Sequence, residues 1–227
     1  MVLSAGVDVS ENRGLDVVVI DSRRRLVGPP LRRVSPDELR TRLDELKPDL
    51  AVVAIDSPPG IGLAGRSRPC ELGLRARGLN IFSTPSDPAR FARPFYHWMR
   101  VGQEAFHAAG AAGFELFSPG RGVRDSALEV YPHASDVALR GGAPPPGVTR
   151  STSRKREWRS ETLRLAGLDT GALGSIDAVD AALAALTGLY GLEGSFEAVG
   201  SPPFFIIVPT AAPTSAARVP GKERPTT

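Results

Sequence analysis

The fold class of this chain is decided by the stretch Asp49-Leu-Ala-Val-Val-Ala-Ile-Asp56. This apolar run shows no alternation, which is typical of a β-strand buried on both faces beside parallel neighbours. Ser57-Pro-Pro-Gly60 follows at once and predicts a turn where the strand ends. Upstream, Ser35-Pro36-Asp37-Glu38 predicts a helix start with a serine N-cap and a capping-box glutamate, and this helix should end near Pro48.

Three short β-rich runs precede that helix and predict a meander of three strands. They are residues Val2–Asp8, Asp16–Asp21 and Arg25–Val27, and turn-forming residues separate them. Three strands, a helix and a buried fourth strand give a β-β-β-α-β start. The sequence therefore predicts an α/β fold built on a mixed sheet.

The remainder of the chain predicts one domain over residues 1–210, followed by a tail. Residues 57–122 are rich in proline, glycine and arginine and are interpreted as a helical and loop insertion. Further elements are expected at residues 127–131, 158–166 and 177–190. Residues 211–227 hold three prolines and one branched apolar residue, which predicts a disordered tail.

The composition excludes several classes of protein. The 227 residues are 41% hydrophobic, and a chain of this length buries a sufficient core without disulfides or structural metal. The single cysteine, Cys70, excludes a disulfide framework and a zinc-ribbon site. No apolar run approaches the roughly 18 residues that span a bilayer, so we expect no membrane partner and a cytoplasmic location.

The net charge of +3 does not by itself indicate a polyanionic partner. Residues 211–227 hold three basic residues and one acidic residue, which leaves 25 basic and 24 acidic residues in 1–210. The body of the chain is therefore nearly neutral, and only local charge can indicate a ligand.

Two aspartates stand where predicted strands end. Asp8 closes the first strand and Asp56 closes the fourth, and turn-forming residues follow each. In open α/β sheets ligands bind beyond the carboxyl ends of the strands, so aspartates on neighbouring strands are placed to share one ion. The alternative is that each aspartate caps a turn.

A second pair of acids opens the predicted helix at 177–190. Asp177 and Asp180 lie about 60° apart on the helix surface, because each residue turns the helix by about 100°. They share a stripe with Ala181, Ala184 and Gly188, which favours close packing on a sheet rather than a solvated face. The alternative is that acids in the first turn only complement the helix dipole.

Carboxylate oxygens suit Mg²⁺ or Mn²⁺ rather than zinc. Two such ions about 4 Å apart can hold the attacking water and the leaving oxygen of a phosphodiester. Glu129, an acid in an otherwise apolar strand, is a further catalytic candidate, although an outward-facing position on a wet sheet face also explains it. The expected metal ligands are Asp8, Asp56, Asp177 and Asp180.

Two basic stretches are candidates for contacts with phosphate. Residues 150–159 include Lys155 and Arg159 with an interleaved tryptophan, and residues 66–77 include Arg68 and Arg75. The alternatives are a solvated helix start for the first stretch and surface solubility for the second.

Several short motifs occur together in order over roughly residues 4–210. They are the strand ending at Asp8, Ala-Ile-Asp56-Ser-Pro-Pro-Gly60, Arg68-Pro-Cys-Glu71 with Arg75, Phe82-Ser-Thr-Pro85, Glu129-Val-Tyr-Pro132 and Asp177-Ala-Val-Asp180-Ala-Ala. In these motifs the chain resembles the predicted RNase H-like nucleases grouped as domain of unknown function 429. The last motif also resembles the final helix of Holliday-junction resolvases.

The resemblance implies a ribonuclease H-like fold: a mixed sheet with a three-stranded meander first, then β-α units, and helices on both faces. By position, Asp8 corresponds to the first-strand acid, Asp56 to the fourth-strand acid, and Asp177 with Asp180 to the acids of the terminal helix, with Glu129 nearby.

The first functional hypothesis is therefore a Mg²⁺- or Mn²⁺-dependent nuclease acting on DNA or RNA. The second is a nucleic-acid or nucleotide-binding module of the same fold without hydrolysis. The third is a sugar-kinase-like phosphotransferase, which needs glycine-rich phosphate loops after the first and fourth strands. Residues 8–14 supply one glycine and residues 56–62 supply two, so this signal is weak.

Overall fold

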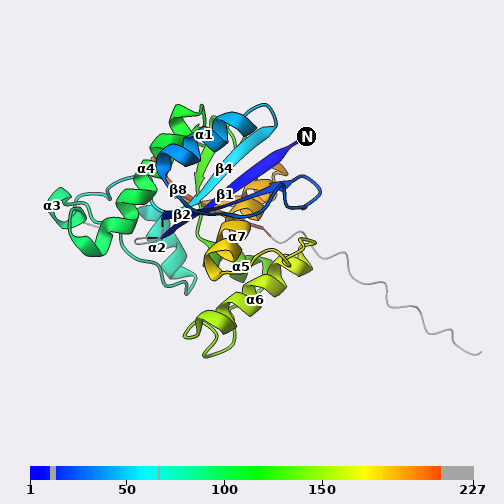
Figure 1. Cartoon of the computed structure of the whole chain (residues 1–227). Coiled ribbons are helices and arrows are strands. Elements are labelled where there is room, and N and C mark those ends of the chain that lie inside the picture. Colours follow the sequence, from blue (N-terminus) through cyan, green and yellow to red (C-terminus); the bar gives the residue numbers. More distant parts are fainter. Residues whose placement is uncertain (11–13, 66, 211–227) are drawn as a thin grey trace, which may run out of the picture.

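The computed structural model describes residues 1–10, 14–65 and 67–210, and the predicted tail lies outside them. A six-stranded mixed sheet with the order β3-β2-β1-β4-β6-β5 forms its centre (Figure 1). The first three strands pair antiparallel, whereas β4 and β6 run parallel to β1 and β5 runs parallel to β6. Its strands are β1 (Leu3–Ser10), β2 (Gly14–Asp21), β3 (Leu31–Val34), β4 (Leu50–Asp56), β5 (Glu115–Leu116) and β6 (Ser126–Glu129). The predicted mixed α/β fold is confirmed.

The third strand of the meander lies later in the chain than predicted. In the predicted run Arg25–Val27, Leu26 forms only an isolated bridge to β2, and the third strand is β3. The carboxylate of Asp21 accepts hydrogen bonds from the backbone N–H groups of Arg23 and Arg25 and from the Arg25 guanidinium. These bonds hold a tight turn directly after β2, so the run 25–27 serves the turn rather than the sheet.

Strand β4 is buried on both faces, as its apolar run predicts. Val53 and Ile55 pack into one core with α1 (Pro36–Leu46) and α4 (His97–Ala111), whereas Val52 and Ala54 pack on the opposite side with Ala184. Helix α1 begins as expected, because the Ser35 hydroxyl accepts from the Glu38 N–H and the Glu38 carboxylate accepts from the Ser35 N–H. Helices therefore cover both faces of the sheet (Figure 1).

Helix α7 (Ile176–Leu192) packs closely on β1, which confirms the role predicted for its small residues. A Cβ atom on Gly6 of β1 would lie 2.0 Å from the backbone oxygen of Ala181 and 2.2 Å from the backbone nitrogen of Ala185. A Cβ atom on Gly188 would lie 2.4 Å from the Ser4 hydroxyl. This approach brings the first turns of α7 to the carboxyl end of β1.

The other elements surround this centre. The predicted insertion contains α2 (Pro69–Ala76), α3 (Pro88–Phe91), the 3₁₀ helix η1 (Pro94–Tyr96) and α4, and α4 packs in the same core as β1 and β4. Helices α5 (Pro132–Arg140) and α6 (Thr152–Leu165) lie beyond α7 (Figure 1). A separate hairpin of β7 (Phe196–Ser201) and β8 (Phe204–Pro209) packs against α2 and α5. Within the described ranges, no helix is long and apolar enough to cross a membrane.

Candidate functional site

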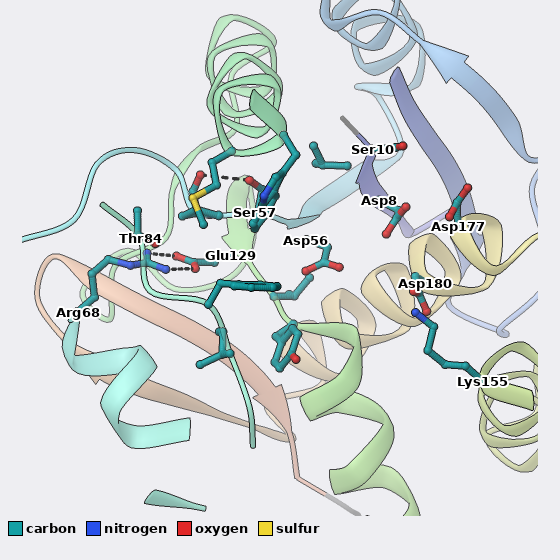
Figure 2. Close-up of a pocket in the computed structure, with 18 residues that line it drawn as sticks. Asp8, Ser10, Asp56, Ser57, Arg68, Thr84, Glu129, Lys155, Asp177 and Asp180 are labelled. Carbon is teal, nitrogen blue, oxygen red and sulfur yellow. Dashed lines mark hydrogen bonds and ion pairs between the residues drawn. The ribbon is translucent and has the colours of Figure 1, made fainter. Parts of the chain in front are cut away.

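A pocket of about 430 Å³ opens at the carboxyl ends of β1, β4 and β6. Asp8 and Asp56 are direct partners in the parallel pairing of β1 with β4, so their side chains meet at one edge of the sheet. Helix α7 supplies two more acids from its first two turns (Figure 2). We call these four pocket-lining residues the acid cluster: Asp8, Asp56, Asp177 and Asp180.

Burial and repulsion between carboxylates perturb Asp8 and Asp56 of the acid cluster. Asp8 is 9% exposed and Asp180 is 7% exposed. Burial, followed by repulsion from Asp180 and Asp56, raises the pKa of Asp8 well above its ordinary value. Burial and repulsion from Asp180 raise the pKa of Asp56 to about 8, although Arg159 opposes this change. The pocket therefore disfavours the charged forms of Asp8 and Asp56.

Helix α6 supplies positive charge to this side of the pocket. Arg159 is buried and forms an ion pair with Asp180, and Lys155 lines the pocket one turn earlier (Figure 2). Burial raises the pKa of Asp180, whereas Arg159 and Lys155 lower it. Arg159 is thus engaged inside the protein, and this setting differs from the phosphate contact that its sequence position suggested.

A second buried group lies at the opposite wall of the pocket. The Arg68 guanidinium donates to Glu129 Oε1 and Oε2, both at 2.7 Å, and its Nε donates to Glu71 Oε1 at 2.8 Å. Glu71 Oε1 also accepts from the backbone N–H and the hydroxyl of Thr84, at 2.9 and 2.6 Å. We call Arg68, Glu71, Thr84 and Glu129 the Arg68 network.

This network changes the interpretation of two predicted site residues. Arg68, expected to contact phosphate, is 1% exposed and directs its guanidinium toward two glutamates. Glu129, expected to be catalytic, has both oxygens occupied by Arg68, so we leave it out of the proposed chemistry. Arg68 and Glu71 stand at the N-cap and N3 positions of α2, and this helix-start spacing is a sequence signal that could have indicated their contact.

Arg75, the remaining predicted phosphate contact, supports the wall of the pocket. Its guanidinium donates to the backbone oxygen of Ile81 at 3.0 Å, to the Ser83 hydroxyl at 2.7 Å and to the Ser67 hydroxyl at 2.9 Å. The loop that it holds carries Phe82, which lines the pocket. Sequence reasoning missed the apolar side of the pocket, formed by Ile81, Phe82, Trp98, Met99 and Tyr131.

The acid cluster fits Mg²⁺ or Mn²⁺ by the chemistry of its donors. Its oxygens are hard ligands, and the repulsion that raises the pKa of Asp8 and Asp56 is the charge that a bound cation offsets. In residues 1–10, 14–65 and 67–210, no three acid, histidine or cysteine side chains stand in a metal-holding arrangement. A cation held by the acid cluster would therefore need some of these side chains to take other positions.

Comparison with known proteins agrees with the resemblance seen in the motifs. No curated protein matches the chain, and no solved structure matches it. The family described as "Protein of unknown function (DUF429)" matches residues 6–203, which include the acid cluster and the Arg68 network. Because this match covers most of the chain, the protein belongs to that family.

Proposed function

We propose that this protein is a Mg²⁺- or Mn²⁺-dependent nuclease whose metal ligands are the residues of the acid cluster. The observation that carries the proposal is that buried Asp8 and Asp180 and partly buried Asp56 line one pocket, where burial and repulsion from Asp180 raise the pKa of both Asp8 and Asp56. Such an arrangement costs stability, and strongly perturbed acids in a cleft are typical of functional sites. An ion-pair network that served only to stabilise the fold would be better neutralised.

We also propose that the fold is ribonuclease H-like. The support is the order β3-β2-β1-β4, with an antiparallel meander first, α1 between β3 and β4, and β4 parallel to β1. In such a sheet the acids of β1 and β4 meet at one edge, where α7 adds its own.

The reaction would be the hydrolysis of a phosphodiester. Water adds to phosphorus, one ester P–O bond breaks, and the leaving oxygen takes up a proton. A bound divalent ion supplies activation of the water and stabilisation of the developing charge. Asp8 and Asp56 orient the site from rigid strand ends, whereas Lys155 adds positive charge that attracts the phosphate. Arg68 and Glu129 hold the opposite wall and take no part in the chemistry.

A cleavage assay on the full chain tests the proposal. Labelled single-stranded, duplex and branched DNA and RNA are incubated with Mg²⁺ or Mn²⁺, with EDTA as the blank. We expect metal-dependent cleavage of at least one substrate, reduced at least about a hundredfold by Asp8→Asn or Asp56→Asn. Asp44→Asn, which removes an exposed acid from α1, should leave the rate unchanged.

Two results would contradict the nuclease. One is the absence of cleavage of every substrate with either metal, and the other is equal cleavage by the wild type and the Asp8→Asn variant. Binding of nucleic acid without cleavage would instead support the non-catalytic module.

A further inference from the structure

An exposed aromatic group borders the carboxylate pocket. Phe82 is 64% exposed and Phe95 is 58% exposed, and their ring centroids lie 5.9 Å apart. The ring of Trp98 lies 6.4 Å from that of Phe82, in an edge-to-face arrangement. Phe82 and Trp98 also line the pocket that holds the acid cluster. One cavity therefore has an acidic side and an aromatic side.

The loop that presents Phe82 is held on both sides of this residue. Before it, the Ile81 carbonyl accepts from Arg75, and after it, the Ser83 hydroxyl accepts from the same guanidinium. One residue further, Thr84 is bonded through its N–H and its hydroxyl to the buried Glu71. The fold thus fixes a large apolar ring in contact with water, although burial of that ring would stabilise the protein.

The combination of these two sides indicates the chemistry of the occupant. A volume of about 430 Å³ suits a ligand the size of one nucleotide rather than a duplex. An aromatic ring binds any nucleobase by stacking, but a paired base hides its faces within the helix, so only an unpaired base is available. The acid cluster and Lys155 line the same pocket as Phe82 and Trp98.

We infer that the pocket takes an unpaired nucleotide of single-stranded nucleic acid, with its base against Phe82 and Trp98 and its phosphate toward the acid cluster. The inference rests on the proposed function and names its substrate class. The aromatic side then selects single strands by stacking on the base, and hydrolysis takes place at the acid cluster. Arg75 is then a positioning residue, because it holds the loop of Phe82 and does not touch the nucleotide.

Binding without turnover tests this inference. A fluorescein-labelled thymidine oligonucleotide is titrated with the full chain in EDTA and in Ca²⁺, and its anisotropy is measured. Phe82→Ala should weaken binding about tenfold or more, whereas Phe82→Trp should restore it, because an indole also stacks on a base. Leu165→Ala is the matched control, since it removes an apolar side chain that is 68% exposed on α6 and should leave binding unchanged.

A second titration separates base stacking from phosphate attraction. An abasic oligonucleotide of the same length keeps the phosphates and lacks the bases. The wild type should bind it and the matching duplex at least about tenfold more weakly than the single strand, and Phe82→Ala should discriminate less between base and abasic strands.

Three results would overturn the inference. They are unchanged binding by Phe82→Ala, equal binding of abasic and normal strands, and the absence of binding to any nucleic acid, which would favour a protein partner for this face. If the wild type cleaves nucleic acid but Phe82→Ala binds as tightly as the wild type, the inference is wrong and the proposed function is still supported. Conversely, if Phe82→Ala weakens binding but the wild type cleaves nothing with either metal, the proposed nuclease function is wrong and the inferred nucleotide-binding site is supported.

Discussion

Two groups of acids, each with buried members, lie on opposite walls of one pocket, and their surroundings differ. In the Arg68 network, one guanidinium bonds to both oxygens of Glu129 and to Glu71, which also accepts from Thr84. In the acid cluster, Arg159 pairs with Asp180, yet burial and repulsion still raise the pKa of Asp8 and of Asp56.

This difference separates a structural role from a functional one. A buried charge that is hydrogen-bonded to opposite charges helps to specify the local structure. Its removal leaves the partner charges buried without a counter-ion. Acids that repel one another in a cavity reduce stability, and such an arrangement is typical of a site that binds a ligand or carries out a reaction. Burial raises the pKa of Glu129 as well, but Arg68 opposes this through bonds to both of its oxygens, so the two walls differ in how fully a cation neutralises them.

The largest expected effect on stability comes from breaking the Arg68 network. Arg68→Met should lower the free energy of unfolding by about 3–5 kcal/mol, because Glu71 and Glu129 lose their buried counter-ion. Arg77→Met removes an arginine from an exposed pair with Glu197 and should cost about 1 kcal/mol or less. Denaturant titration measures both, and equal effects would contradict a special role for the network.

The next effect comes from separating α7 from the sheet. Gly6→Ala should destabilise the protein by about 1–3 kcal/mol or more, because its Cβ would meet the backbone of Ala181 and Ala185, which cannot move without the helix. The same shift should move Asp180 relative to Asp8 and reduce cleavage.

The matched control for this change is Gly110→Ala in α4, where a Cβ atom meets nothing within 4 Å. Alanine is the better helix former, so this variant should be as stable as the wild type or slightly more stable. A wild-type melting temperature for Gly6→Ala would show that the close approach of α7 to β1 is not required.

A smaller effect of opposite sign should follow from removing the charge of Asp56, which burial and repulsion from Asp180 both disfavour. Asp56 has a folded-state pKa of about 8 against an ordinary value of 3.8, so the folded state binds its proton more tightly than the unfolded state does. Its destabilising contribution is absent below pH 3.8, grows as pH rises, and is complete above about pH 8.

Asp56→Asn should therefore be more stable than the wild type at pH 8, by about 1 kcal/mol or more, and the difference should shrink toward pH 5. Thermal unfolding in EDTA across this range measures it. Asp44→Asn, at an exposed position in α1, should show no such trend. If the difference in stability between Asp56→Asn and the wild type does not change with pH, then burial and repulsion do not raise the pKa of Asp56.

The sequence predicted the centre of the fold because its signals are local. The apolar run of β4, the capping box at Ser35 and the small residues of α7 each indicate an element or a contact without long-range information. The third strand was misplaced because the Asp21 side chain organises a turn that strand propensity does not report. The aspartates were grouped correctly in one pocket since strand ends and a helix start are readable positions.

The partners of the charged side chains were not predictable in the same way. In the sequence, the three arginines of the predicted phosphate contacts are indistinguishable from surface cations. In the structure Arg68 pairs with Glu129, Arg75 bonds to the loop at 81–83, and Arg159 pairs with Asp180, and each contact depends on tertiary packing. Phe82 received no role in the sequence because exposure of a single aromatic residue is visible only after folding.

Calorimetric titration with Mn²⁺ tests the central claim most directly. At pH 7 the wild type should bind the metal and release protons, because a ligand with a pKa of about 8 must give up its proton to bind. Two buffers with different ionisation enthalpies reveal that release. Asp56→Asn should lose binding and proton release, whereas Glu129→Gln, confirmed as folded by circular dichroism, should keep both. No binding by the wild type, or equal loss in both variants, would contradict the assignment of the acid cluster as the metal site.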